Sequence, residues 1–397
     1  MAVSAHARLK SVAPTVGDAS KRKIKMTLSV KGTKNVTMRL QKVRKVYKEL
    51  IKGGERVDSV SKTDFWNLTW VGRMRRLGRL AEAAIKEFDL EVRDMRVHSF
   101  ATNLLYRIRS RSGTRYILRM AYPGWRTFED LRAEAAWLDA LHRETDIGAP
   151  QVIRSRKGDV ILPMSGFGVS GTWYATLMTW IDGRLLAHAL THENLERMGE
   201  LFAKLHRHGK AWLPPKDFTT KRFEAFLSRR EPDILFSNGT LQSFAAEDKQ
   251  AFLTAREWVE KEYSHLPRND LRVIHCDLWH ENIKVDHGKL RPFDFEDTIW
   301  GYRLHDIAMG MLDLLETVGN ARYQELLLSF RSGYEKLQEW PEGNLEVLQI
   351  GRLLWKVNWT ARFSKDDLAG MSVAYGGIFR NFERTGELRW PEPLKQP

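Results

Sequence analysis

HCDLWHEN (residues 275–282) and RPFDFEDTIWGYRLHDIA (residues 291–308) are the two stretches that decide how this chain folds. The first follows a short apolar strand, and the second ends where helical periodicity begins. Asp277 precedes Asn282 by five residues, and Asp294 stands where a hairpin strand is expected to end. The two carboxylates arrive from separate strand ends, so a cleft can open between them.

This set of side chains suits phosphoryl transfer. That reaction needs a carboxylate facing the acceptor hydroxyl and oxygen ligands that hold Mg²⁺ against the phosphates. Asp277 can accept or orient the acceptor's proton, Asn282 offers the metal a neutral oxygen, and Asp294 offers an anionic one. The alternative is a β-hairpin with turn acids and a helix N-cap at Asp306. The spacing of the whole set favours phosphoryl transfer.

The same two stretches resemble the signature of the aminoglycoside phosphotransferase superfamily. That group includes choline kinases, fructosamine kinases and type II homoserine kinases, and it is related in fold to eukaryotic protein kinases. The resemblance implies an ATP- and Mg²⁺-dependent kinase with Asp277 as the catalytic aspartate and Asn282 and Asp294 as metal ligands. It also implies that His275 and Asp306 brace the catalytic loop rather than react.

Two residues of the loop depart from the family's pattern. Cys276 stands where glycine is common, and Trp279 stands where histidine is common. The cysteine raises the idea of a redox sensor, but a buried cysteine is more often an inert small hydrophobe, which we prefer here. Trp279 is similar to the fructosamine-kinase version of the loop, although one residue cannot assign an acceptor.

The order of expected elements predicts an α+β protein with two lobes, as in the protein-kinase fold. We expect a basic, partly disordered extension over residues 1–60, a nucleotide-binding N-lobe over 61–180, and a C-lobe with the catalytic loop and acceptor site over 181–397. Periodicity and turn residues predict strands over 97–108, 116–121, 159–163 and 173–180. Helices are predicted over 71–88, 127–143, 194–206, 223–226, 246–263, 305–318, 323–337 and 345–363.

The N-lobe should supply the cation that holds the α- and β-phosphates. Arg119 on the strand 116–121 is the candidate, with Glu134 of the following helix as its partner. Arginine is always charged and grips phosphate oxygens in a fork. The alternative is an ordinary exposed Arg–Glu pair. No glycine-rich motif is present, so the phosphate-covering loop is expected over residues 99–103.

The segment 177–183 resembles the hinge between the lobes of kinases. In that reading Met178, Trp180 and Ile181 are expected to meet the adenine of ATP. Packing in the core is the alternative for Met178 and Ile181.

The acceptor is expected to be a hydroxyl of a small molecule such as an amino alcohol, a sugar amine or an aminoglycoside. Glu296, Asp297, Trp355 and Trp359 are candidates to line its site, because carboxylates and tryptophans attract cations. For the tryptophans, which are four residues apart, we favour packing in the core. Two other functions stay open: a catalytically silent nucleotide-binding scaffold and a Ser/Thr protein kinase. The second is disfavoured because no activation segment ending in Ala-Pro-Glu is present.

The net charge of +14 is concentrated at the start of the chain. Residues 1–60 hold fifteen Lys or Arg and four Asp or Glu, whereas the remaining residues hold 49 and 46. The body is therefore close to neutral, and we expect no specific nucleic-acid partner. Residues 1–60, the basic N-terminal arm, are expected to contact an acidic partner or surface.

The remaining composition predicts a cytoplasmic protein. A single cysteine, Cys276, excludes an internal disulfide framework and a Cys-rich zinc site. No run approaches the roughly 18 to 20 apolar residues that cross a bilayer, so no transmembrane segment is expected.

Overall fold

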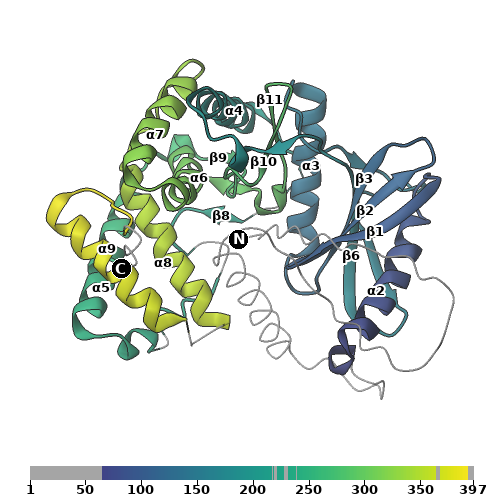
Figure 1. Ribbon diagram of the computed structural model, residues 1–397, viewed down its shortest axis with the longest axis horizontal. Helices are drawn as coiled ribbons and strands as arrows, with labels where there is room; N and C mark the ends of the chain where they lie inside the picture. The colour runs from purple at the N-terminus through teal and green to yellow at the C-terminus, as the bar shows by residue number, and fades with distance from the viewer. Residues whose placement is uncertain are drawn as a thin grey trace, which may run out of the picture. The chain divides into compact units, whose positions relative to one another are not determined.

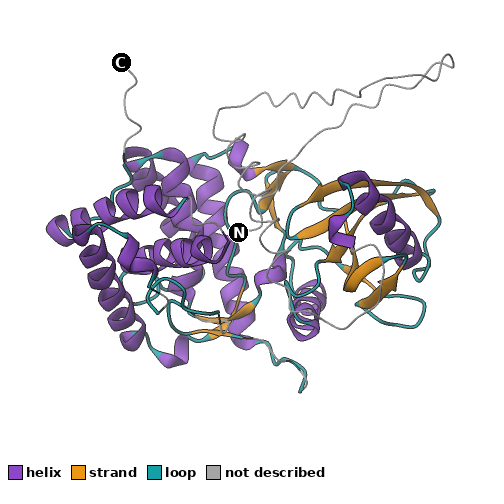
Figure 2. Cartoon of the chain, turned by 90° about the horizontal axis from the view of Figure 1, so that it is seen from below, coloured by secondary structure: helices purple, strands orange, loops and turns teal. Residues whose placement is uncertain are grey.

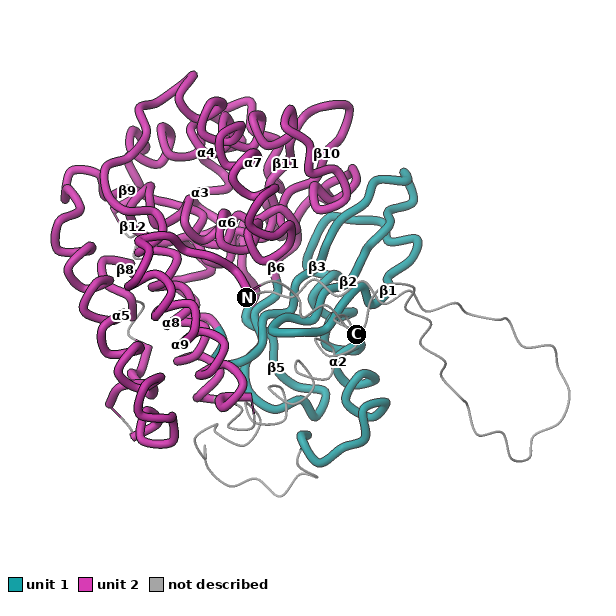
Figure 3. The backbone as a smooth tube through the Cα atoms, turned by 60° about the vertical axis from the view of Figure 1, so that its left-hand side comes forward, with its two compact units in different colours: residues 1–125, 163–175 teal, residues 126–162, 176–397 magenta. Residues whose placement is uncertain are grey.

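The structure is a computed structural model that describes residues 65–216, 218, 221–227, 231–237, 239–363 and 367–391. The chain forms two compact units, coloured separately in Figure 3. Unit 1 comprises residues 1–125 and 163–175, and unit 2 comprises residues 126–162 and 176–397. The extension expected over residues 1–60 lies outside the described residues.

Unit 1 is built on a β-sheet, whose strands are orange in Figure 2. In the sheet the strands follow the order β1, β2, β3, β6, β4, and β5 pairs with β6. Successive strands β1, β2 and β3 run antiparallel. The strands are β1 (Val92–Phe100), β2 (Asn103–Ser110), β3 (Arg115–Ala121), β4 (Val152–Ile153), β5 (Leu162–Gly166) and β6 (Val169–Thr179). Strand β4 and the last residues of β6 belong to unit 2.

Helix α2 (Trp70–Ile85) covers one face of this sheet. Side chains of a strand alternate between faces, and on β2 Tyr106 and Ile108 are buried while Arg107 is half-buried and Arg109 exposed. Burial, followed by the carboxylate of Glu82 on α2, raises the pKa of Tyr106. The buried residues therefore face α2, and the arginines lie on the other face.

Two expectations for this topology were wrong. The single strand expected over 97–108 is two strands, β1 and β2, which turn at residues 101–102. The turn lies inside the phosphate-covering loop expected over residues 99–103, although no glycine or proline marks it. The short helix expected over 223–226 is absent, since β8 (Arg222–Phe223) pairs there with β12 (Ile299–Gly301).

Unit 2 is mostly helical, and its helices are purple in Figure 2. They are α3 (Phe128–Glu144), α4 (His192–Ala211), α5 (Ala246–His265), α6 (Arg303–Val318), α7 (Asn320–Glu335), α8 (Leu345–Phe363) and α9 (Leu368–Thr385). Thr127 and Asp130 form a reciprocal capping box at the start of α3, which explains why that helix begins where the sequence predicts. No helix of the described residues has the length and apolarity needed to span a membrane.

Helices α4 and α7 lie side by side in unit 2 (Figure 1). Their approach depends on two glycines. A Cβ on Gly199 would lie 1.9 Å from the Phe330 carbonyl oxygen, and one on Gly333 would lie 1.8 Å from that of Glu196. Backbone packs against backbone at this crossing, so no side chain fits.

Two small sheets of unit 2 position the loops that carry the candidate residues. Strand β9 (Arg272–Ile274) pairs with β12 and leads into residues 275–282. Strands β10 (Ile283–Asp286) and β11 (Lys289–Pro292) form a hairpin that also pairs with β7 (Arg184–Leu185). The HCDLWHEN run therefore joins one sheet to the other.

Replacing Gly333 by alanine is expected to destabilise unit 2 by about 3 kcal/mol, because a new Cβ must push two helix backbones apart. The matched control is Gly377→Ala in α9, whose added Cβ meets nothing within 4 Å. That variant should gain about 0.5 to 1 kcal/mol from helix propensity. Denaturant unfolding of both variants measures the difference, and equal effects would contradict the proposed backbone contact.

Candidate active site

Asp277 lies in the loop that follows β9, and the carboxamide of Asn282 holds it. The Asn282 Nδ2 donates to the Asp277 carbonyl oxygen at 2.8 Å and to its Oδ2 at 3.1 Å. Both residues are buried, with relative exposures of 4 % and 0 %. The five-residue spacing therefore closes a ring in which one side chain fixes both the backbone and the carboxylate of Asp277.

Asp294 lies beside this loop because the β10–β11 hairpin returns the chain to it. Ile283 pairs with Pro292, and the Phe293 N–H donates to the Asn282 carbonyl oxygen at 2.9 Å. Asp294 follows at once, with a left-handed φ of 67°. The hairpin thus brings Asn282 and Asp294, twelve residues apart, to one place.

The oxygens here fit a hard divalent cation. Asn282 Oδ1 is buried and accepts no hydrogen bond, and a buried polar atom normally has a partner. Carboxylate and amide oxygens are the ligands that Mg²⁺ prefers. Among the described residues no group of three or more His, Cys, Asp or Glu could hold a metal ion, so a site at Asn282 and Asp294 depends on an amide and on oxygens from outside the protein.

The charge of Asp277 is set by its surroundings. Burial, reinforced by the carboxylates of Asp297 and Asp313, raises the pKa of Asp277 to about 7. The guanidinium of Arg352 opposes this shift, because its Nη2 lies 3.3 Å from Asp277 Oδ1. One carboxylate oxygen thus meets Asn282 and the other meets an arginine that the motif does not contain.

Asp306, in the first turn of α6, holds the loop of residues 275–282 through hydrogen bonds. Its Oδ1 accepts from the Cys276 N–H at 2.6 Å, and its Oδ2 accepts from His206 Nε2 at 3.0 Å. Burial favours the neutral acid, but the hydrogen bonds from His206 and Cys276 hold the pKa of Asp306 below its ordinary value of 3.8. Burial also lowers the pKa of His206, whose Nδ1 is 3.0 Å from the Tyr334 hydroxyl.

His275 ties the loop to the residues that precede Asp294. Its Nδ1 accepts from the Asp277 N–H at 3.3 Å, and its Nε2 donates to the Phe293 carbonyl oxygen at 3.2 Å. Burial lowers the pKa of His275, so the ring is neutral and can serve both contacts. The ring also packs on Phe295 at 4.4 Å between centroids.

Cys276 is buried and has a left-handed φ of 65°. Only glycine adopts this conformation without strain, which explains why related loops commonly have glycine here. Its Sγ lies 3.6 Å from His305 Nε2, and His305 Nδ1 lies 2.5 Å from the Tyr263 hydroxyl. The thiol is therefore enclosed among ring side chains.

Helix α8 presents buried polar residues that the sequence did not single out. The guanidinium of Arg352 lies 4.2 Å from the centroid of the Trp355 ring. Lys356 forms ion pairs with Asp313, at 3.2 Å, and with Glu316 of α6. Burial opposes the charge of Lys356, but the two carboxylates raise its pKa. Spacing alone could not reveal these partners, because they belong to helices far apart in sequence.

The four acceptor-site candidates have different surroundings. Asp297 forms an ion pair with Arg126, and Trp355 Nε1 donates to Glu231 at 2.6 Å. Trp355 is buried and its ring lies 6.4 Å from that of Trp359. Glu296 is buried as well.

The nucleotide candidates are divided between the two units. Arg119 is a buried residue of β3 in unit 1, and Glu134 is a buried residue of α3 in unit 2. In unit 2, Lys284 of β10 donates to the Ile181 carbonyl oxygen at 2.6 Å and lies 4.6 Å from the centroid of the Trp180 ring.

Met178, the third candidate of the segment 177–183, pairs with Val152 of β4 and is mostly buried.

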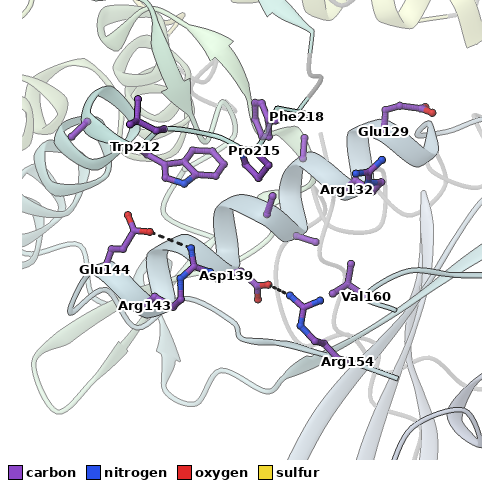
Figure 4. A pocket seen from close by; sticks show the side chains of 15 residues that line it. Glu129, Arg132, Asp139, Arg143, Glu144, Arg154, Val160, Trp212, Pro215 and Phe218 are labelled. Carbon is purple, nitrogen blue, oxygen red and sulfur yellow. Dashed lines mark hydrogen bonds and ion pairs between the residues drawn. The ribbon is translucent and has the colours of Figure 1, made fainter. Parts of the chain in front are cut away.

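A pocket of about 640 Å³ opens elsewhere on unit 2, along α3 (Figure 4). Four of its charged side chains form two ion pairs: Arg154 with Asp139 at 2.5 Å, and Arg143 with Glu144 at 3.2 Å. None of the catalytic, metal-binding, nucleotide-binding or acceptor candidates lines it. This pocket therefore does not coincide with the candidate site.

A family model for the phosphotransferase enzyme family matches residues 95–340, more than half of the chain. The chain belongs to the phosphotransferase enzyme family. This confirms the resemblance drawn from residues 275–308 and, with it, that the protein is a phosphotransferase.

This phosphotransferase has distant curated relatives. An uncharacterized protein of Synechocystis sp. is 22 % identical over 283 residues, which cover 69 % of this chain and 76 % of the relative. Amicoumacin kinase of Bacillus subtilis is 26 % identical over 114 residues, which cover 27 % of this chain and 32 % of that kinase.

Solved structures of small-molecule kinases share its fold. An amicoumacin kinase in complex with AMP-PNP, Ca²⁺ and Ami aligns with a TM-score of 0.64 and 16 % identity, covering 82 % of this chain and 98 % of the other. A microcompartment-associated aminopropanol kinase aligns with a TM-score of 0.64 and 18 % identity, covering 79 % and 99 %. The predicted α+β, protein-kinase-like fold is confirmed.

Replacing Asp306 by asparagine is expected to destabilise the phosphotransferase by about 3 kcal/mol at pH 7, because the buried His206 and Cys276 donors lose their charged acceptor. A carboxylate with a lowered pKa contributes stability above its unfolded value near 4 and loses it as pH falls through the folded value. The difference between wild type and variant should therefore be full at pH 6 to 8 and shrink below about pH 4. Urea unfolding across this range measures it.

The control for this experiment is Asp159→Asn, at an exposed carboxylate of the same unit. A D306N variant as stable as this control would show that the Asp306 contacts contribute nothing.

Proposed function

We propose that this phosphotransferase transfers the γ-phosphoryl group of Mg²⁺-ATP to a hydroxyl of a small, amine-bearing molecule. Asp277 is the proposed catalytic residue, and Asn282 and Asp294 are the proposed metal ligands. The proposed acceptors are amino alcohols, sugar amines and aminoglycosides.

One observation carries this proposal: Asn282 uses its amide nitrogen to fix Asp277 and leaves a buried amide oxygen without a donor. A residue with only a structural role would have both ends satisfied. An amide oxygen beside a carboxylate, with Asp294 brought alongside by the hairpin, is a donor set that a hard cation completes. Mg²⁺ bound there would neutralise the charge of the phosphates.

The chain's own residues would act on the acceptor as follows. Asp277 orients the acceptor hydroxyl and takes its proton as the acceptor oxygen bonds to the γ-phosphorus. The bond from that phosphorus to the bridging oxygen breaks, and ADP leaves with the electron pair. Arg352 acts through Asp277. Its guanidinium binds the second oxygen of the Asp277 carboxylate and so fixes the orientation of that carboxylate.

An amine on the acceptor is supported by two buried acids near Asp277. Asp297 of η5 (Phe295–Asp297) and Asp313 of α6 are buried and both raise the pKa of Asp277. Two of the solved kinases with this fold are named for amicoumacin and aminopropanol. Aminopropanol carries both an amine and a hydroxyl.

The proposed nucleotide-binding residues are Arg119, Glu134, Met178, Trp180 and Ile181. Arg119 and Glu134 are buried charged residues, and such residues are rarely retained without a partner or a function. AMP-PNP in the amicoumacin kinase complex is consistent with a nucleotide donor here as well.

The central test is phosphoryl transfer by the full chain with ATP and Mg²⁺ across a panel of amino alcohols, sugar amines and aminoglycosides, with ADP release as the readout. Asp277→Asn should lower kcat by about 10²- to 10⁴-fold while ATP binding persists. Asp286→Asn, at the end of β10 in the same hairpin, is the matched control and should retain activity. Full activity in D277N would disprove the mechanism, and ATP binding without transfer to any acceptor would favour a silent scaffold.

Arg352→Met is expected to lower kcat by about 10- to 100-fold. Without the arginine the Asp277 carboxylate is no longer held in the orientation that reaches the acceptor's proton. The KM for ATP should stay near the wild-type value, and Arg352→Lys should restore part of kcat. Arg362→Met, an exposed position of the same helix, serves as the control. A rise in KM for the acceptor with unchanged kcat would instead assign Arg352 to acceptor binding.

A further inference from the structure

One face of α8 carries Arg352, Trp355 and Trp359, because residues three or four apart on a helix lie on the same side. Arg352 contacts Asp277, the proposed catalytic residue. Trp355 follows about 5 Å further along the helix axis, and its ring centroid lies 4.2 Å from the guanidinium of Arg352. The Trp359 ring is next, 6.4 Å from that of Trp355. This face of α8 therefore leads away from the catalytic candidate within unit 2.

Glu231 reaches the same face from the chain that precedes α5. Trp355 Nε1 donates to Glu231 Oε2 at 2.6 Å. Glu231 is half-buried, as is Trp359, so a ligand can reach both side chains. Asp277 and Glu231 thus contact α8 at residues that are three positions apart on one face. A molecule lying along this face can present one group to each carboxylate.

The segment that carries Glu231 is fixed to α8 by Asn358. The Asn358 Oδ1 accepts from the Ile234 and Leu235 N–H groups at 2.8 and 2.9 Å. Its Nδ2 donates to the Pro232 carbonyl oxygen at 3.1 Å. Asn358 is only 1 % exposed, and a buried amide that uses both its ends on one backbone segment holds that segment in place. The position of Glu231 is therefore set by the helix that also contacts Asp277.

The charge of Glu231 exceeds what the fold requires. A buried indole N–H needs one hydrogen-bond acceptor, and an uncharged oxygen would supply it. Glu231 instead places a carboxylate beside the Trp355 ring, and it forms no ion pair with any Lys, Arg or His of the described residues. Arg352, on the same helix face, pairs with Asp277. A partly buried carboxylate without a counter-charge is unfavourable, and a cationic ligand would offset this cost.

The chemistry of the site selects an amine as that ligand. Trp355 uses one oxygen of the Glu231 carboxylate, and an ammonium group can donate to the other. Such a charge-assisted hydrogen bond is about twice as strong as a neutral one. The indole rings of Trp355 and Trp359 attract cations as well. A carboxylate or phosphate on the ligand would be repelled by Glu231.

We propose that Glu231 is a specificity-determining residue that binds the protonated amine of the acceptor, while Asp277 orients the acceptor's hydroxyl. This inference rests on the proposed function and deepens it, because it assigns the amine to a residue that the sequence did not single out. Glu231 touches no reacting atom. It should therefore govern acceptor binding and leave the chemical step unchanged.

The test is steady-state kinetics of the full chain with acceptor pairs that differ only by an amine or a hydroxyl: aminopropanol with propanediol, and glucosamine with glucose. Glu231→Gln keeps an oxygen for the Trp355 N–H and removes only the charge. It should raise KM for the amine of a pair about 10- to 100-fold. The kcat, the KM for ATP and the KM for the uncharged acceptor should stay within about twofold of wild type.

The matched control is Glu257→Gln, which removes the same charge from an exposed position of α5 in the same unit. It should change no kinetic constant. Trp355→Phe keeps a ring but removes the donor that holds Glu231, and it should raise KM for the amine by about 2- to 10-fold. Urea unfolding of E231Q verifies that the variant folds as the wild type does.

Two results would overturn the inference while the proposed function stands: an unchanged KM for the amine in E231Q, or an equal rise in KM for both members of a pair. The first would leave the amine to other residues, and the second would make Glu231 a purely structural group. Failure of the wild type to phosphorylate any acceptor would instead overturn the proposed function, and this inference with it.

Discussion

The carboxylate of Asp306 is the group on which the candidate active site depends. It is fully buried and ionised, and it connects three segments distant in sequence: α4 through His206, the catalytic loop through Cys276, and its own helix α6. A buried charge is stable only when hydrogen bonds replace the water it has lost. The loop therefore has one position in which Asp306 is satisfied, and Asp277 is held in that position.

The fixed geometry of the loop is accompanied by backbone strain at two residues. Cys276 and Asp294 both have left-handed backbones, which cost about 1 kcal/mol or more for residues other than glycine. At Cys276 the strain turns the N–H toward Asp306. At Asp294 it follows directly from the end of the hairpin that places this residue beside Asn282. Two local distortions thus align the three oxygen-bearing side chains.

The helices beside Asp277 follow a different principle, in which buried charges neutralise one another across helices. Arg352 meets Asp277, and Lys356 meets Asp313 and Glu316. Such pairs are costly to bury and are strongly destabilising when broken. Arg352 also fixes the orientation of the Asp277 carboxylate, which is the proposed catalytic group.

The sequence by itself determined the class of fold, and it predicted the candidate residues of the loop. Asp277, Asn282 and Asp294 could be found because their spacing is short and reflects one loop and one hairpin. The helices of unit 2 other than α9 could be found because their apolar faces repeat along contiguous residues, whereas α9 (Leu368–Thr385) was not predicted. The turn between β1 and β2 has no glycine or proline, so only the resemblance to the family, and not the local pattern, placed a loop over residues 99–103.

Only the tertiary structure decided which residues surround Asp277 and which arginines share a face. Arg352 lies 75 residues beyond Asp277, so no short spacing in the sequence pairs the two residues. Arg96 and Arg107 are opposite one another only because of strand register, which depends on hairpin geometry rather than on composition. Contacts between segments far apart in the chain are set by packing, and a linear pattern does not record packing.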